Sequence, residues 1–200
     1  MIVRSHKGGA STNIDTRMII TFILVCIWGL RMAIHVFLRT ELGKEDRRFL
    51  NLRRQLNEKG GPALYYTVAF FGIFMTNGCI ITAINSSALY VSMFSVGDPI
   101  NVQDIIGIII WSIGFLILTI SDHQLRVFKK SLIMNPNSDE KLCKTGLWAY
   151  SRHPNLFGES IVWWGIYLLA CGVNGGWITL WSPILIFILV RFVSGVPTIE

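Results

Sequence analysis

The chain has 200 residues, of which 52% are apolar and only 15% are charged, and its mean hydropathy is +0.52. This composition excludes a freely soluble enzyme, a disordered chain and a small disulfide-rich secreted protein. The formal net charge of +6 does not indicate nucleic-acid binding, because the basic residues stand at the ends of apolar blocks, where they orient membrane proteins. The four cysteines form no close-spaced pair, so neither a disulfide framework nor a zinc site is predicted.

The apolar residues are gathered into five segments, each close to the roughly 20 residues that a helix needs to cross a bilayer. They predict an all-α, multi-pass transmembrane bundle. A polar N-terminal tail, residues 1–17, precedes a single membrane-embedded domain, residues 18–200. The five expected spans are 18–38, 62–84, 105–120, 156–173 and 177–193.

The connections between these segments differ sharply in charge. Connections 39–61 and 121–155 contain seven and six Lys or Arg residues, whereas 85–104 and 172–176 contain none. The positive-inside rule therefore places the two basic connections in the cytosol. Arg17 and two further basic residues of the N-terminal tail oppose this orientation. The first basic connection is expected to be a solvated loop or a surface helix.

A charged stripe is expected just after the third segment. If that helix continues past the membrane surface, Asp122, Arg126, Lys129 and Lys130 fall along one face. One acid followed by three bases suits a ribose hydroxyl followed by phosphates. Juxtamembrane basic residues attracted to anionic lipid explain the same pattern.

The start of the fourth segment predicts an anion-binding corner. Pro154 suits the first turn of a helix, where its missing N–H costs nothing. The free N–H groups of that turn, with Arg152 and His153 beside them, attract an anion. This corner and the charged stripe bound the same cytosolic loop.

Two polar residues share one face of the fourth helix. Asn155 and Glu159 are four residues apart, and Trp163 continues that face one turn deeper. A carboxylate in an apolar helix favours a role in holding a polar ligand, although capping of the helix dipole is the alternative. Gly158 and Gly165 permit close helix packing.

The first segment also contains two polar residues on one face, Arg31 and His35. An intramembrane anchor or a polar pair between helices explains them more readily than contact with a ligand.

Together these motifs resemble a poorly characterised multi-pass membrane family related to the steroid 5-alpha-reductase C-terminal domain. The resemblance rests on SDHQ at 121–124, GLWAYSRHPNLFGE at 146–159, WWG at 163–165 and SGVPTIE at 194–200. It implies an integral membrane fold with a cytosolic-facing NADPH site. It also implies reduction of a carbon–carbon double bond, conjugated to a carbonyl, in a lipid-like substrate such as a steroid or another enone.

The resemblance also assigns roles to single residues. Asn155 and Glu159 match the Asn-x-x-Gly-Glu motif that lies against the nicotinamide, and Asp122 and Arg126 match positions along the cofactor. The expected catalytic residues are Glu159 and Tyr150, and the expected cofactor-binding residues are Asp122, Arg126, Lys129, Arg152, His153, Asn155 and Glu159. If the source is a eukaryote, the resemblance implies a location in the endoplasmic reticulum membrane.

Two departures from the reductase pattern keep other functions open. The segment SRHP at 151–154 resembles isoprenylcysteine carboxyl methyltransferases, which bind S-adenosylmethionine. Members of the family usually continue into a tyrosine-rich cytosolic tail, which this chain is expected to lack after Glu200. A membrane methyltransferase and a non-catalytic lipid-binding membrane protein are therefore the alternatives, and no oligomeric state is predicted.

Overall fold

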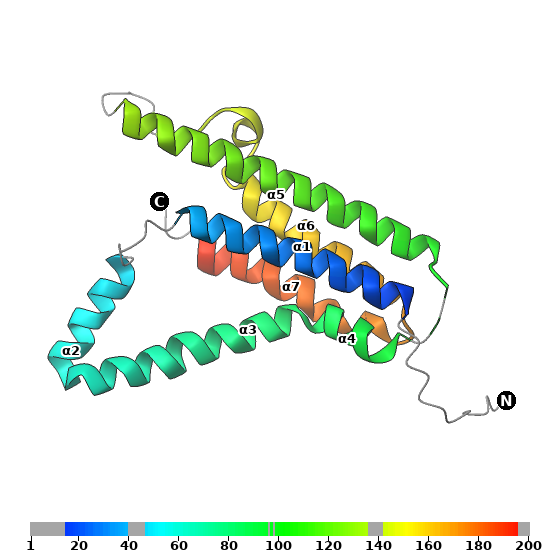
Figure 1. Cartoon of the computed structure of the whole chain (residues 1–200), viewed down its shortest axis with the longest axis horizontal. Helices are drawn as coiled ribbons and strands as arrows, with labels where there is room; N and C mark the ends of the chain where they lie inside the picture. The colour runs from blue at the N-terminus through cyan, green and yellow to red at the C-terminus, as the bar shows by residue number, and fades with distance from the viewer. Residues whose placement is uncertain (1–14, 40–46, 96, 98, 136–141, 196–200) are drawn as a thin grey trace.

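The computed structural model describes residues 15–39, 47–95, 97, 99–135 and 142–195. The prediction of an all-α membrane bundle is confirmed, since the described residues form helices and short connections without a strand (Figure 1). The N-terminal tail up to residue 14, parts of both basic connections and the end of the SGVPTIE motif lie outside these residues. The helices are α1 (Thr16–Arg39), α2 (Arg47–Val68), η1 (Ala69–Met75), α3 (Thr76–Ile84), α4 (Ser86–Phe94), α5 (Val102–Met134), η2 (Gly146–Ala149), α6 (Pro154–Cys171), η3 (Gly176–Leu180), α7 (Trp181–Ile188) and η4 (Leu189–Gly195).

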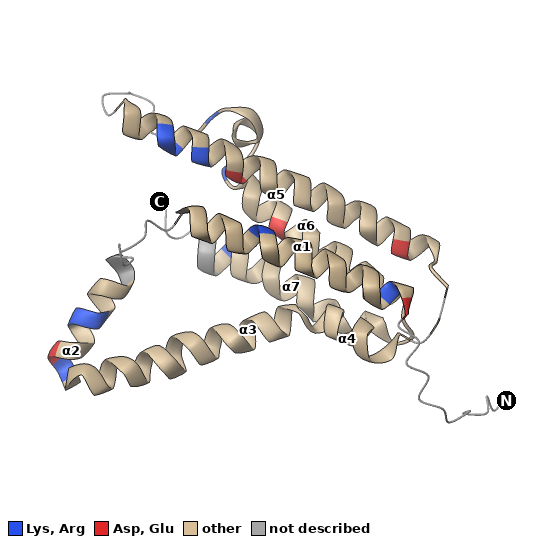
Figure 2. Cartoon of the chain, viewed as in Figure 1, with Lys and Arg blue, Asp and Glu red and all other residues tan. Residues whose placement is uncertain are grey.

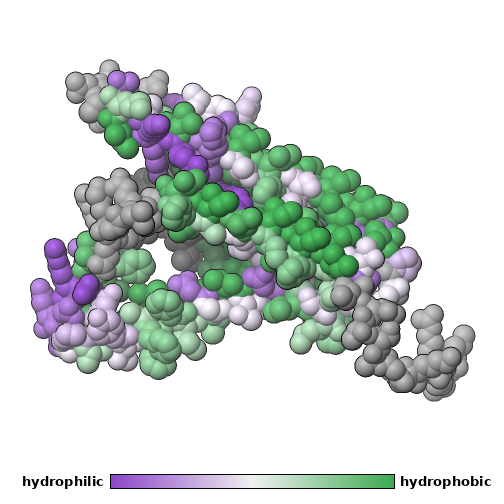
Figure 3. Space-filling model, viewed as in Figure 1, coloured by the Kyte–Doolittle hydropathy of each residue, from purple (hydrophilic) through white to green (hydrophobic). Residues whose placement is uncertain are grey.

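Three helical segments are long and apolar enough to cross a membrane: Thr16–Leu38, Phe49–Ile84 and Val102–Met134. The stretch Gly176–Phe192 is a shorter apolar helix, and α6 adds 18 apolar-rich residues. Figure 2 shows most charged residues near helix ends and on α2, with a few charges inside the bundle on α1 and α6 and long uncharged stretches between them. Figure 3 shows a broad apolar surface over α1 and α5. These features fit an integral membrane protein.

The second segment is interrupted where the sequence places two glycines together. Gly60 and Gly61 have non-helical backbone angles, and Gly61 has a φ of 69°, which is in the left-handed region that favours glycine. The polar part of α2 therefore turns away from the apolar part, which continues through η1 into α3 (Figure 1). The expectation of a surface helix within 39–61 is met by the start of α2 at Arg47.

The structure differs from the prediction at α5 and adds a short helix before it. Helix α5 begins at Val102 and ends at Met134, well beyond the expected 105–120. Its start is fixed by a capping box, in which Asn101 Oδ1 accepts from the Asp104 N–H and Asp104 Oδ2 accepts from the Asn101 N–H. The connection 85–104, for which no secondary structure was predicted, contains α4, whose Val91 is fully buried. Packing against α6, rather than a sequence period, stabilises this short helix.

Helix α6 is the centre of the bundle and packs against α1, α4, α5 and α7. Its Val162, Trp163, Ile166 and Leu169 are at most 2% exposed. Small residues set the close approach of α5 and α6. A Cβ on Gly158 would lie 2.7 Å from the backbone nitrogen of Leu118. Because the nearest atoms are backbone, the two helices cannot stay in place with a larger residue there, and the packing role expected of Gly158 is confirmed.

Candidate functional site

Helix α5 continues past its apolar part, as the charged stripe required, and Asp122, Arg126, Lys129 and Lys130 all lie on it. Asp122 is buried, with 7% of its surface exposed. The three basic side chains are exposed. The stripe therefore begins at a carboxylate inside the bundle and continues into solvent at the α5 end that projects beyond the other helices (Figure 2).

Helix α6 brings Asn155 to this carboxylate. Pro154 is the first residue of the helix, as expected, and is itself buried. Asn155 donates from Nδ2 to Asp122 Oδ1 at 3.3 Å. Its amide oxygen, Oδ1, is buried and accepts no hydrogen bond from any residue that the structure describes. A buried amide oxygen without a donor is unfavourable, which makes this atom a candidate contact for a ligand N–H or O–H.

Helix α1 supplies the positive charge that Asp122 needs. Arg31 forms an ion pair with Asp122 Oδ2, and His35 Nδ1 lies 3.4 Å from the same oxygen. The favoured sequence interpretation, a polar pair between helices, accounts for both contacts. The helix partner, which that interpretation left open, is Asp122 on α5.

Glu159 lies one turn deeper on α6, within an aromatic enclosure. Its Oε1 accepts from Trp28 Nε1 at 3.0 Å and from Trp163 Nε1 at 3.3 Å. The two indole rings meet edge to face, with centroids 5.1 Å apart. Two neutral donors therefore share one carboxylate oxygen. Among the described residues, no donor reaches the second oxygen, Oε2.

The loop that follows α5 is fixed to the helix by polar contacts. Gln124 Oε1 accepts from the Leu147 N–H at 3.0 Å, and Trp148 Nε1 donates to the Ser121 carbonyl at 3.0 Å. Gly146 has a φ of 61°, and a Cβ there would lie 2.2 Å from Gln124 Nε2. The loop therefore closes over the side chain of Gln124.

The other predicted residues are more exposed than Asp122. The structure places Tyr150 at 91% exposure and Arg152 at the surface, while His153 is partly buried just before α6. Arg126 and Lys129 remain on the exposed stripe. The residues brought together are Asp122 and Asn155 in one group and Glu159 in the next turn of α6.

Sequence reasoning missed the contact between Trp28 and Glu159. A signal for it exists, because Trp28, Arg31 and His35 are spaced three and four residues apart and therefore lie on one face of α1. That face meets α5 and α6 with one indole N–H and two cationic or ionisable groups. The site thus combines two carboxylates, two indole donors, one guanidinium, one imidazole and one amide oxygen without a partner.

Comparison with known proteins gives one result. No curated protein and no solved structure matches the chain. A family model described as "Protein of unknown function (DUF1295)" matches residues 2–200. Because this match covers nearly the whole sequence, the chain belongs to the DUF1295 family.

Proposed function

We propose that this protein is a membrane oxidoreductase that uses NADPH to reduce a conjugated carbon–carbon double bond in a lipid-like substrate. The proposal extends the resemblance of its motifs to steroid 5-alpha-reductases. The observation that supports it most is the convergence of Asp122, Asn155 and Glu159, from α5 and α6, beside an exposed basic stripe.

The amide oxygen of Asn155 suits the nicotinamide end of the cofactor. Its Nδ2 is used by Asp122, so the side chain is oriented with Oδ1 available as an acceptor. A carboxamide N–H is a donor of the kind that this buried oxygen lacks. Glu159, held by Trp28 and Trp163, is the second candidate contact because only its Oε1 is used by these indoles.

The α5 stripe suits the remainder of the nucleotide. A carboxylate accepts about four hydrogen bonds, so Asp122 retains capacity for a ribose hydroxyl beside Arg31 and His35. Arg126 and Lys129 are exposed and on the same helix, where they can pair with phosphates.

The reaction adds a hydride to one carbon of the double bond and a proton to the other. NADPH, when bound, supplies the hydride. We assign the proton to His35, whose Nδ1 lies 3.4 Å from Asp122 Oδ2, because a histidine side chain can act as a general acid. Tyr150, expected to be catalytic, remains the alternative source, although its side chain points into solvent.

The proposed topology has five crossings, with both basic connections in the cytosol and, in a eukaryote, the endoplasmic reticulum as the membrane. The objection raised by Arg17 is weakened, because Asp104 neutralises its charge inside the bundle. The apolar exterior admits a lipid substrate from the bilayer, and the nucleotide approaches from the cytosolic end.

The test is a cofactor-binding measurement on the detergent-purified, full-length protein with NADPH and, separately, S-adenosylmethionine. We expect saturable binding of NADPH, and loss of that binding in Asn155→Leu. Asn77→Leu is the matched control, because Asn77 is an exposed amide on α3. Binding of S-adenosylmethionine alone would support the methyltransferase, and binding of neither would support a non-catalytic protein; both results contradict the proposal.

A further inference from the structure

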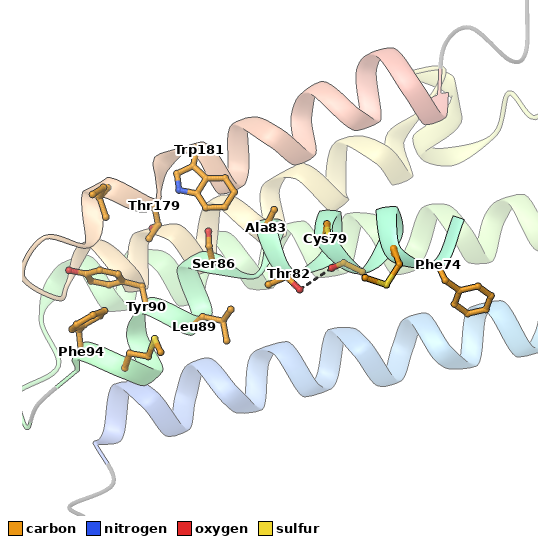
Figure 4. Close-up of a pocket in the computed structure, with 14 residues that line it drawn as sticks. Phe74, Cys79, Thr82, Ala83, Ser86, Leu89, Tyr90, Phe94, Thr179 and Trp181 are labelled. Carbon is orange, nitrogen blue, oxygen red and sulfur yellow. Dashed lines mark hydrogen bonds between the residues drawn. The ribbon is translucent and has the colours of Figure 1, made fainter. Parts of the chain in front are cut away.

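A concave site lies among α3, α4, η3 and the start of α7. A groove of about 790 Å³ runs along α3 and α4 and is closed on its other side by η3 and the start of α7 (Figure 4). Phe74 stands at one end, and Tyr90 and Phe94 stand at the other. Phe74 and Met93 are 74% and 76% exposed, so the groove is accessible from the surroundings of the bundle.

The groove is separate from the polar cluster. None of its lining residues is Asp122, Asn155, Glu159 or one of their partners on α1. It extends toward the end of the bundle where α6 ends. There the hydroxyl of Tyr90 donates to the backbone carbonyl of Asn174, in the turn after α6. Its α3 wall belongs to the membrane-length segment Phe49–Ile84, so we expect the open side of the groove to face lipid.

The chemistry of the walls limits what can bind. No lining residue is charged, so an anionic or cationic headgroup would be desolvated without a counterion. Thr82, Tyr90 and Thr179 each donate to a backbone carbonyl at 2.8–2.9 Å. The hydroxyl of Ser86 differs, because its Oγ is buried and has no hydrogen-bond partner within the described part of the chain.

We propose that this groove binds a neutral lipid that carries a hydroxyl or carbonyl oxygen. The apolar body lies along α3 toward Phe74, and the oxygen accepts a hydrogen bond from Ser86. Ser86 is the lining hydroxyl whose proton is not used by the protein, and a neutral oxygen acceptor satisfies it without introducing a charge. The volume lies within the range of small-molecule pockets, roughly 300–1,000 Å³.

Access to this hydroxyl depends on Trp181. Figure 4 shows the oxygen of Ser86 pointing toward the indole of Trp181 on the opposite wall. Trp181 is 46% exposed, and the proposal requires its indole to turn outward to admit the lipid oxygen. The site is thus covered by a rim side chain rather than by the core.

The glycines of the same segment provide a matched pair of variants. Gly78 lines the groove, and a Cβ there meets nothing within 4 Å, so Gly78→Leu fills the groove without distorting its own helix. Gly72 lies outside the groove on η1, and a Cβ there meets only a Val68 methyl at 3.8 Å. Gly72→Leu therefore adds the same side chain to the same segment.

The experiment uses the full-length protein in phosphatidylcholine vesicles and photoreactive diazirine probes: a long-chain alcohol, the matching carboxylic acid and the matching hydrocarbon. Labelled peptides are mapped by mass spectrometry. We expect the alcohol to label the groove several-fold more than the acid or the hydrocarbon. Loss of one neutral hydrogen bond in Ser86→Ala should lower alcohol labelling roughly two- to tenfold, and Ser86→Thr should restore it.

Gly78→Leu should abolish groove labelling by the alcohol, and Gly72→Leu should retain it. Equal labelling by the alcohol and the hydrocarbon would overturn the proposal, as would unchanged labelling in both Ser86→Ala and Gly78→Leu. If Ser86→Ala does not fold, the two glycine variants decide. None of these readouts depends on NADPH, so the groove and the proposed reductase activity are tested independently.

Discussion

Arg17 and Asp104 form an ion pair at the end of the bundle opposite the polar cluster, with both side chains fully buried. The guanidinium Nε and Nη2 meet the two carboxylate oxygens at 2.9 and 2.8 Å, and Nη2 also donates to the Pro99 carbonyl at 3.3 Å. A Cβ on Gly172 would lie 2.6 Å from Asp104 Oδ1. The pair therefore joins the starts of α1 and α5 at the end of α6.

Breaking this pair should strongly destabilise the fold. Arg17→Met leaves a buried carboxylate without its partner, and we expect a loss of about 3–5 kcal/mol of unfolding free energy. The double variant Arg17→Met/Asp104→Leu removes both charges and should recover much of that loss. Thermal unfolding followed by tryptophan fluorescence measures both. Lys130→Met, an exposed position, is the control, and an equal loss there would contradict the assignment.

Adding a single methyl group at Gly158 should push α5 and α6 apart and lower the stability of the fold. Gly158→Ala places a Cβ against the Leu118 backbone, and overpacking of this kind costs about 1–3 kcal/mol. Gly78→Ala is the comparison, because its Cβ meets open space. We expect a lower melting temperature for the first and an unchanged or slightly higher one for the second. Similar melting temperatures would show that the helices tolerate a wider spacing.

Substitutions of Glu159 should separate cofactor binding from stability. Glu159→Gln keeps the size of the side chain, and Glu159→Leu makes the helix more apolar, so both should fold. We expect weaker NADPH binding in the first and none in the second. Trp28→Phe removes one of the two indole donors and should weaken binding less than Glu159→Leu. Melting temperature and NADPH affinity are measured on the same preparations.

A purely structural role for Glu159 gives the opposite pattern. If the carboxylate only caps the helix dipole, both variants lose thermal stability, and the folded fraction keeps its NADPH affinity.

Arg126 should distinguish NADPH from NADH. If its guanidinium contacts the additional phosphate of NADPH, Arg126→Ala should weaken NADPH binding about tenfold and leave NADH binding nearly unchanged. Equal losses for both nucleotides would place Arg126 at the shared diphosphate, and no loss would favour contact with lipid headgroups. Affinities are compared at one ionic strength, because exposed charges are screened by salt.

The proposed orientation is tested by cysteine accessibility. Lys144 and Asn174 are exposed and lie at opposite ends of the bundle. On a background without the native cysteines, Lys144→Cys in sealed vesicles of known orientation should react with a membrane-impermeant reagent only from the cytosolic side. Asn174→Cys should react only from the other side. The reverse result would invert the topology and remove the cytosolic nucleotide site.

Local features of the site were predictable from sequence because they depend on helix geometry alone. The start of α6 at Pro154, and the shared face of Asn155 and Glu159, follow from a helix N-terminus and a spacing of four. The pairing of Arg31 with Asp122 does not, since it depends on how α1 lies against α5 although 90 positions separate the two residues in the sequence. Periodicity identifies a face but not the helix that it meets.

The features that the sequence does not show have similar causes. Helix α4 has nine residues, too few to show a period, and is fixed by tertiary contacts such as Ser87 Oγ to Thr179 Oγ1 at 3.0 Å. The expected catalytic Tyr150 was inferred from its place in a motif. Its exposure results from the path of the loop after η2, which contacts between Gln124 and Leu147 determine.

The continuous length of α5 has a consequence for the size of any ligand on its stripe. Its 33 residues span about 50 Å, against about 30 Å of hydrocarbon. Asp122 and Lys129 are therefore held about 10 Å apart along one rigid rod. A small anion such as inorganic phosphate can contact Lys129 but is too short to reach Asp122 as well. Only an extended molecule can contact both residues. A ligand that contacts both side chains must therefore span about 10 Å along the helix.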